Sequence, residues 1–290
     1  MTFARPQTPD AAPRRVAVIG GGIAGMAAAH LLAETSSVVL YEAEPRLGGH
    51  ARTVIAGKRK DQPVDTGFIV FNRVNYPNLV ALFEKLDVPT CESEMSFGAS
   101  IKGGKLEYGL CSLDAIFAQR RNVADPRFLR MLSDILHFHR NAEVAATDPN
   151  MTIRELLGRL GTGAWFRDHY LTPFSGAIWS TPTAGILDFP AMAMIRFFRN
   201  HALLQRKAHQ WYTVKGGSIE YVRRLQAAMV AQGVHIRTGT PIAGVRREAG
   251  VVMVRAKGDE WELFDDVVFA THSDQTLRLL ADPTVAEAQS

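Results

Sequence analysis

The spacing of hydrophobic residues changes twice along the chain. Two short apolar runs, at 16–19 and 38–41, flank a stretch with helical spacing, which predicts a strand, a helix and a second strand. From about Ser112 onward, helical spacing takes over. Strand-like runs return after Trp211 and end with a buried strand at 266–271. We therefore expect β-structure toward both ends of the chain and helices between them.

The middle of the chain carries three patterns that begin helices. Asp125 precedes a proline and a long apolar stripe, and Asp188 precedes a shorter apolar stripe. Thr152 and Glu155 have the spacing of a capping box, in which each side chain bonds the backbone N–H of the other residue. These patterns predict a mainly helical domain over 89–209.

The length of the chain predicts more than one domain. At 290 residues it exceeds the usual size of a single hydrophobic core. Residues 1–13 are rich in Pro, Ala and Thr without periodicity, and we interpret them as a loose leader. We expect residues 14–88 and 210–290 to form one discontinuous α/β domain, into which the helical domain 89–209 is inserted. In its second part, the Gly-Gly-Ser triplet at 216–218 predicts a capped helix start.

The first strand runs directly into a GxGxxG pattern formed by Gly20, Gly22 and Gly25. In a βαβ unit these glycines make a tight turn, let a pyrophosphate approach the backbone, and let the helix pack closely on the sheet. The helix that begins near Ile23 directs its free N–H groups at the phosphates. Glu42 ends the second strand, 17 residues after Gly25, where a carboxylate accepts hydrogen bonds from ribose hydroxyls. The pattern predicts a bound dinucleotide, and the carboxylate disfavours NADP.

The composition is that of an ordinary soluble globular protein, with 47% hydrophobic and 21% charged residues. Its two cysteines, Cys91 and Cys111, form no CxxC pair, which argues against a disulfide reductase and indicates reduced intracellular thiols. Outside the glycine-rich unit there is no run of about 18 uncharged apolar residues, so we expect no membrane-spanning helix. We expect a cytoplasmic protein, or one bound peripherally at the inner face of the membrane.

The net charge of +4 resides in the middle third of the chain. Between Cys111 and Gln210, 12 Lys and Arg residues stand against 8 Asp and Glu residues. A solvated helical face is the favoured interpretation, and attraction to an anionic lipid surface or an acidic substrate is the alternative. The stretch 192–199, with apolar residues flanked by arginines, suits a packed helix, which is favoured, or peripheral membrane contact. Because basic and acidic residues are mixed, no nucleic-acid partner is expected.

The histidines form no pattern that indicates a metal site or a catalytic group. His137 and His139 are two residues apart and cannot share one face of a helix, so no metal site is expected. Chain order alone supports no Ser-His-Asp or Cys-His arrangement. The catalytic residues are therefore not predicted.

The glycine motif continues into an Arg-Leu-Gly-Gly sequence at 46–49, and the segment 42–53 resembles the flavin-containing amine oxidase superfamily. This superfamily also includes phytoene-desaturase-like and protoporphyrinogen-oxidase-like enzymes. The resemblance extends to 65–68, 216–218 and 267–272, and more narrowly to bacterial predicted NAD/FAD-binding proteins of this superfamily. It implies FAD as the cofactor and a Rossmann-like FAD-binding domain, with the inserted helical domain facing the substrate.

The resemblance also implies roles for individual residues. Glu42 would hold the adenosine ribose, and Arg46 would lie beside the adenosine half of the cofactor. Gly67 and Phe68 would approach the flavin ring. The expected cofactor-binding residues are Gly20, Gly22, Ile23, Gly25, Glu42, Arg46, Gly48, Gly49, Arg52, Gly67, Phe68 and Ile242.

The roles of Ile242 and Arg52 rest on a comparison with the family pattern. Ile242 matches a position whose backbone contacts adenine. The family commonly has arginine where this chain has His50, and Arg52, two residues further on, is the candidate substitute for that phosphate contact.

The function implied by the resemblance is that of an FAD-dependent oxidoreductase, either amine oxidase-like or lipid desaturase-like. It would transfer hydride from a C–N or C–C bond of a small-molecule amine or lipid to the flavin. The family normally continues beyond the strand ending near Ala270 to a glycine-containing segment that closes over the cofactor, whereas Gly258 is the last glycine here. The FAD-binding domain is therefore expected to be incomplete, and a truncated, non-catalytic dinucleotide-binding protein is the alternative.

Overall fold

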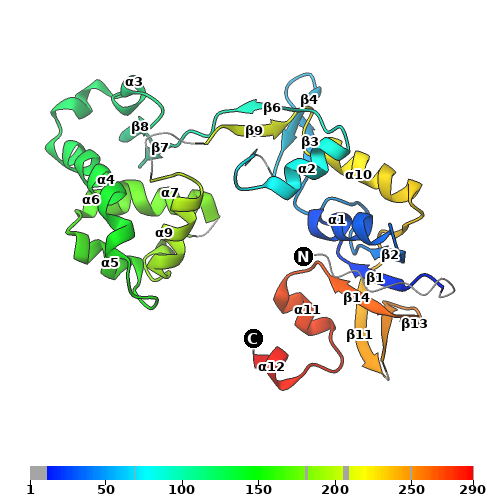
Figure 1. Cartoon of the computed structure of the whole chain (residues 1–290). Coiled ribbons are helices and arrows are strands. Elements are labelled where there is room, and N and C mark those ends of the chain that lie inside the picture. Colours follow the sequence, from blue (N-terminus) through cyan, green and yellow to red (C-terminus); the bar gives the residue numbers. More distant parts are fainter. Residues whose placement is uncertain (1–11, 69, 180–181, 205–208, 249, 290) are drawn as a thin grey trace. The chain divides into compact units, whose positions relative to one another are not determined.

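The computed structural model describes residues 12–289 except for 69, 180–181, 205–208 and 249, so most of the expected leader lies outside the described residues. The chain forms two compact units, which we describe separately (Figure 1). The first unit comprises residues 1–71, 77–91 and 212–290, and the second comprises 72–76 and 92–211.

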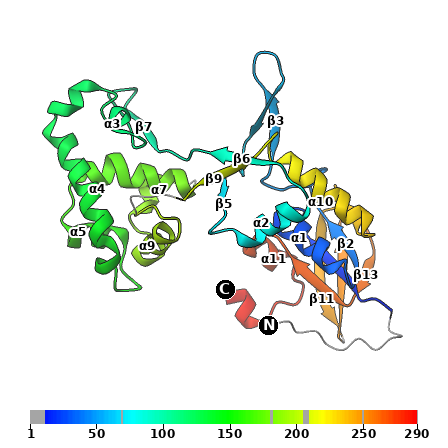
Figure 2. The same cartoon turned by 45° about the horizontal axis from the view of Figure 1, so that its top comes forward.

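A four-stranded parallel sheet is the centre of the first unit. Its strands, in spatial order, are β10 (His235–Arg237), β2 (Ser37–Tyr41), β1 (Arg15–Ile19) and β14 (Asp266–Phe269). Helices α1 (Ile23–Leu32) and α10 (Ile219–Ala231) lie side by side on one face of this sheet (Figure 2). The predicted strand, helix and second strand at the amino end are therefore confirmed.

The other face of the parallel sheet is covered by a three-stranded antiparallel sheet. Its strands are β11 (Ile242–Glu248), β12 (Val251–Ala256) and β13 (Trp261–Phe264). Because side chains alternate along a strand, Ala17 and Ile19 of β1 point to this face and pack with Val245, Val254 and Phe264. The burial of both faces explains why β1 and β2 are apolar without alternation.

Shorter elements complete the first unit. They are β3 (Thr53–Ala56), β4 (Gln62–Asp65), α2 (Pro77–Lys85), α11 (Ser273–Leu279) and α12 (Val285–Gln289). The boundaries between the units fall in β5 (Phe71–Asn72), β6 (Thr90–Ser93) and β9 (Trp211–Val214), or beside them.

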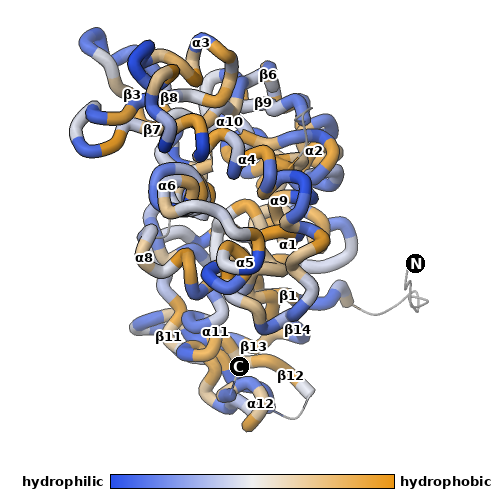
Figure 3. Tube along the Cα trace, turned by 90° about the vertical axis from the view of Figure 1, so that its left-hand side faces the viewer, coloured by the Kyte–Doolittle hydropathy of each residue, from blue (hydrophilic) through white to orange (hydrophobic). Residues whose placement is uncertain are grey.

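The second unit consists mainly of helices around one apolar core. Its elements are β7 (Gly98–Ile101), β8 (Leu106–Gly109), α3 (Leu113–Ile116), the 3-10 helix η1 (Arg120–Ala124), α4 (Pro126–Ala145), α5 (Ile153–Leu160), α6 (Ala164–Phe166), the π-helix η2 (Arg167–Leu171), α7 (Thr172–Trp179), α8 (Thr183–Ile186) and α9 (Ala191–Asn200). Along its longer helices, hydrophobic and hydrophilic residues alternate as amphipathic helices require (Figure 3).

Two of the three predicted helix starts in the second unit are capped as expected, and the third is not. Asp125 caps α4 by accepting a hydrogen bond from Arg127 N at 2.9 Å, and Thr152 forms the complete capping box of α5. Asp188 caps nothing: α9 begins three residues later, after Pro190, and Asp188 pairs with Arg154 at 3.0 Å. In the part of the chain that the structure describes, no helix combines the length and apolarity needed to cross a membrane.

Two helical glycines provide a test of how tightly α1 is packed. A Cβ atom on Gly25 would lie 1.8 Å from the carbonyl oxygen of Gly20, whereas a Cβ on Gly158 of α5 would meet nothing within 4 Å. We expect Gly25→Ala to lower the free energy of unfolding by about 3 kcal/mol, because backbone must move. Gly158→Ala is the matched control and gains up to about 1 kcal/mol from helix propensity. Chemical denaturation followed by circular dichroism measures both, and equal stability of the two variants would contradict this packing.

Candidate nucleotide-binding site

The loop between β1 and α1 has the geometry that a phosphate-binding turn requires. Gly20 has φ +109°, and a Cβ there would lie 2.6 Å from the carbonyl oxygen of Ala270 at the end of β14. Helix α1 begins at Ile23 with Gly22 as its N-cap, without a side-chain cap and without an acidic residue in its first turn. A Cβ on Gly22 would meet no atom within 4 Å, so open space lies in front of it. The first N–H groups of α1 are thus available to an anion.

The carboxylate of Glu42 is hydrogen-bonded to this loop. Its Oε2 accepts a hydrogen bond from Gly21 N at 2.6 Å, and its Oε1 accepts one from Glu44 N at 2.8 Å. A carboxylate has about four acceptor positions, so roughly two stay available for ribose hydroxyls. Glu42 therefore joins the end of β2 to the glycine loop while keeping capacity for a sugar.

The segment that follows β2 returns to the same loop. Gly48 N donates to the carbonyl oxygen of Gly21 at 2.8 Å, and Gly48 forms a parallel bridge with Gly22. A Cβ on Gly49, which has φ +55°, would lie 3.0 Å from the Cα of Gly22. Arg46 donates to the carbonyl oxygen of Gly49 at 3.0 Å. The two glycine segments thus form one surface, and Arg46 fixes the second segment.

Gly67 and Phe68 continue this surface. A Cβ on Gly67 would lie 1.9 Å from the carbonyl oxygen of His50, so only glycine fits at this approach. Phe68 packs against Phe71 and Tyr221, with ring centroids 6.4 and 6.1 Å apart. Burial, and secondarily the carboxylate of Asp65, raises the pKa of Tyr221 to about 12, so this phenol is neutral at physiological pH.

Arg52 and Ile242 take different positions relative to the loop. The carbonyl oxygen of Arg52 accepts a hydrogen bond from Thr66 N at 2.9 Å, and its exposed guanidinium forms no ion pair within the described residues. The side chain of Ile242 packs in the core between the two sheets. The backbone just before it is close to the acid, because Thr240 N donates to the carbonyl oxygen of Glu42 at 2.9 Å.

Asp65 makes an anchor that the sequence did not predict. Its carboxylate accepts hydrogen bonds from the Ser218 hydroxyl at 2.7 Å, Ser218 N at 2.9 Å and the Thr53 hydroxyl at 2.6 Å. The Thr53 hydroxyl in turn accepts a bond from Ile219 N at 3.0 Å. The 216–218 triplet marks the start of α10 as expected, with Ser218 at the N-cap position. Ser218 makes no side-chain cap, and the N–H groups of Ser218 and Ile219 are instead satisfied by Asp65 of β4 and Thr53 of β3. Only the resemblance over 65–68 pointed to this position.

Two further residues of the site escaped the sequence reasoning. Gly21 supplies the N–H that holds Glu42, and Ala270 closes the loop from the side of β14. Glycine and alanine have no functional group in the side chain, so no sequence pattern indicated them. Both contribute to the site through their backbone atoms.

The comparisons with known proteins show the family to which the chain belongs. A family model described as flavin containing amine oxidoreductase matches residues 23–290. The chain belongs to this family. No curated protein matched the chain.

Solved structures of oxidases share the fold of this family member. Cyclohexylamine oxidase from Brevibacterium oxydans IH-35A has 17% identity and a TM-score of 0.72, with 96% of this chain and 62% of that chain covered. Putrescine oxidase bound to putrescine has 18% identity and a TM-score of 0.68, with 95% and 62% covered. A putative protoporphyrinogen oxidase from Exiguobacterium sp. 255-15 has 20% identity and a TM-score of 0.66, with 96% and 63% covered. The chain thus spans less than two thirds of each of them.

The family assignment confirms three predictions from the sequence. The resemblance to flavin-containing amine oxidases is confirmed, and the flavin cofactor is confirmed at the level of the family. The α/β fold class with a Rossmann-like domain is confirmed by the parallel sheet and by the shared fold.

Replacing the Asp65 carboxylate tests the anchor of α10. We expect Asp65→Asn to lower the free energy of unfolding by about 2 kcal/mol, because every partner of Asp65 donates and an amide N–H would face Ser218 N. The matched control is Asp61→Asn in the same hairpin, whose exposed ion pair with Arg59 contributes less than about 1 kcal/mol. Urea denaturation measures both variants. A loss at Asp61 as large as that at Asp65 would show that the anchor adds nothing specific.

Proposed function

We propose that this chain binds FAD along the surface formed by Gly20 to Gly25, Glu42 and Gly48 to Gly49. The observation that carries the proposal is the pairing of an uncapped α1 N-terminus with the Glu42 carboxylate on Gly21 N. The first feature suits a pyrophosphate, and the second suits a ribose.

Each predicted residue has a part in the proposed complex. The N–H groups at Gly22 and Ile23 would bind the pyrophosphate, in the open space in front of Gly22. Glu42 would accept hydrogen bonds from the adenosine ribose, and Gly67 and Phe68 would line the path toward the flavin. Arg46 would act through the backbone of Gly49, which it already binds. Ile242 would place the preceding backbone beside the adenosine, and Arg52 would offer its guanidinium to a phosphate.

We propose that the complete protein is an oxidoreductase acting on a C–N or C–C bond. A bound flavin supplies the acceptor for the hydride. The residues described above bind and orient that group, and the neutral Tyr221 and Phe68 rings exclude water from its neighbourhood. A small-molecule amine is the favoured substrate class, because the family model and the solved amine oxidases point to it. An unsaturated lipid is the second candidate, supported by the resemblance to desaturase-like enzymes.

The alternative of a non-catalytic nucleotide-binding protein makes a different prediction. It would bind FAD without reducing it in the presence of any substrate. We also propose a cytoplasmic location, with peripheral membrane contact as the lipid variant, because Cys91 and Cys111 are both free and exposed thiols.

The cofactor assignment predicts a yellow protein that releases FAD when it is denatured. We expect Glu42→Gln to raise the Kd for FAD roughly 10- to 100-fold, because a charge-assisted bond to ribose is worth about 1.5–3 kcal/mol. Glu44→Gln, two residues away and exposed, is the matched control and leaves Kd unchanged. Fluorescence titration of the apoprotein measures Kd, and thermal unfolding shows that both variants fold. A colourless folded protein that does not respond to FAD would refute the assignment.

The substrate class is tested by bleaching of the flavin absorption without oxygen. We expect a primary aliphatic amine to bleach the bound flavin, and re-admitted oxygen to restore it. An unsaturated acyl lipid in detergent is the second arm. Bleaching by the lipid alone would select the desaturase-like reaction, and bleaching by neither would favour the non-catalytic alternative.

A further inference from the structure

A hollow of about 700 Å³ in the second unit shares no lining residue with the candidate nucleotide site. It lies among the β7–β8 turn, η1, the start of α4, and the segment α6–η2. Four of its lining residues are basic, and only one is acidic. The polar and aromatic residues that line it are Lys102, Lys105, Arg121, Asn122, Asp125, Arg127, Trp165 and His169.

The hollow carries an uncompensated positive charge. Among the described residues, Lys102, Lys105 and Arg121 form no ion pair with an acidic side chain. Arg127 is paired with Asp125 at 2.9 Å, which cancels that charge locally. Three positive charges therefore remain around the hollow, and they come from two adjacent elements.

Two buried N–H or ring-nitrogen groups at the hollow have no partner. Asn122 is only 5% exposed, and its Nδ2 makes no hydrogen bond. Nδ1 of His169 is likewise buried without a hydrogen bond. Both residues line the hollow, but these two nitrogen atoms have almost no accessible surface and offer no direct contact to a ligand there. The charge around the hollow therefore comes from the exposed cations.

One wall of the hollow is aromatic and apolar. Trp165 stacks on His169 with ring centroids 4.6 Å apart, and the Arg127 guanidinium lies 4.7 Å from the centre of the Trp165 ring. Ile101 and Leu106 line the same space. A ligand with an anionic group and an uncharged body would therefore contact both parts.

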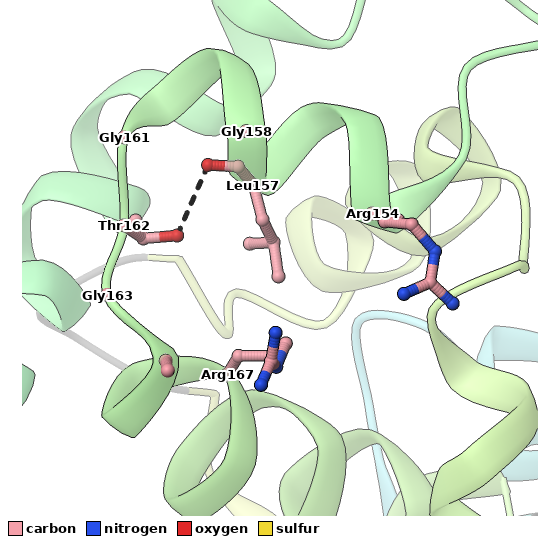
Figure 4. A pocket seen from close by; sticks show the side chains of 8 residues that line it. Arg154, Leu157, Gly158, Gly161, Thr162, Gly163 and Arg167 are labelled. Carbon is pink, nitrogen blue, oxygen red and sulfur yellow. Dashed lines mark hydrogen bonds between the residues drawn. The ribbon is translucent and has the colours of Figure 1, made fainter.

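A smaller hollow in the same unit is lined by arginines whose charges are already compensated by ion pairs. It has about 360 Å³ and is lined by Arg154 and Arg167, which project toward it (Figure 4). Both arginines are already paired, Arg154 with Asp188 at 3.0 Å and Arg167 with Asp168 at 2.6 Å. The smaller hollow thus lacks the excess charge of the larger one.

We propose that the larger hollow binds a phosphomonoester. Three unpaired cations around one hollow suit a group with two negative charges and three terminal oxygens better than a single carboxylate. The phosphomonoester comes from one of two sources, a soluble phosphorylated molecule or the headgroup of an anionic lipid. This site would give the helical unit a ligand of its own, in addition to the nucleotide proposed for the first unit.

The test uses the full chain and two matched double variants. Lys102→Gln with Lys105→Gln removes two charges from the β7–β8 turn. Lys58→Gln with Lys60→Gln removes two charges from the β3–β4 turn of the first unit, and Lys60 has φ 53°, as Lys102 does. All four lysines are exposed, so we expect both double variants to fold. Calorimetry measures binding of glycerol 3-phosphate, and co-sedimentation measures binding to phosphatidylcholine vesicles with and without phosphatidic acid.

We expect saturable binding that weakens at least tenfold in the Lys102 and Lys105 variant and stays within twofold in the Lys58 and Lys60 variant. This pattern with glycerol 3-phosphate identifies a soluble source. The same pattern with phosphatidic acid vesicles alone identifies a lipid source. Absence of binding in both arms, or an equal loss in the two double variants, overturns the proposal, since equal loss indicates only long-range attraction.

Discussion

The candidate nucleotide site depends on how closely two stretches of backbone approach each other at the start of α1. The Cβ position of Gly25 would lie 1.8 Å from the Gly20 carbonyl oxygen, and that of Gly20 would lie 2.6 Å from the Ala270 carbonyl oxygen. No side chain fits in either place, so helix, loop and β14 meet through backbone alone. This contact aims the N-terminus of α1, and Glu42 then joins the loop to β2 through Gly21 N. The segment with Gly48 is held to the same loop, because Gly48 N donates to the carbonyl oxygen of Gly21.

Local patterns in the sequence were enough to predict the elements that depend on neighbours along the chain. The βαβ unit follows from glycine spacing, and the Thr152 capping box follows from a four-residue motif. The anchor of α10 did not follow, because Asp65 and Ser218 are 153 residues apart and their hydrogen bonds leave no periodicity. The larger hollow of the second unit escaped for the same reason, since its lining runs from Ile101 to His169. The sequence shows which side chains are charged or can form hydrogen bonds, but it does not show which of them come together in the fold.

The shared fold at 17–20% identity with solved oxidases is understandable in these terms. A parallel sheet buried on both faces needs apolar strands of the right length, and many combinations of Val, Ile and Leu supply them. The few positions where only glycine fits are harder to exchange. A chain that keeps these positions and its hydrophobic periodicity can change most other residues and retain the architecture.

The pairing of β1 with β14 has a consequence for synthesis on the ribosome. Arg15 N bonds the carboxylate of Asp265, 250 residues further along the chain, and β14 follows immediately. During translation, the edge of β1 that pairs with β14 therefore stays unpaired until the helical unit has been synthesised. An unpaired apolar strand edge is prone to join the wrong partner. We therefore expect the early part of this protein to depend on chaperones during translation, whereas the helical unit has an apolar core of its own.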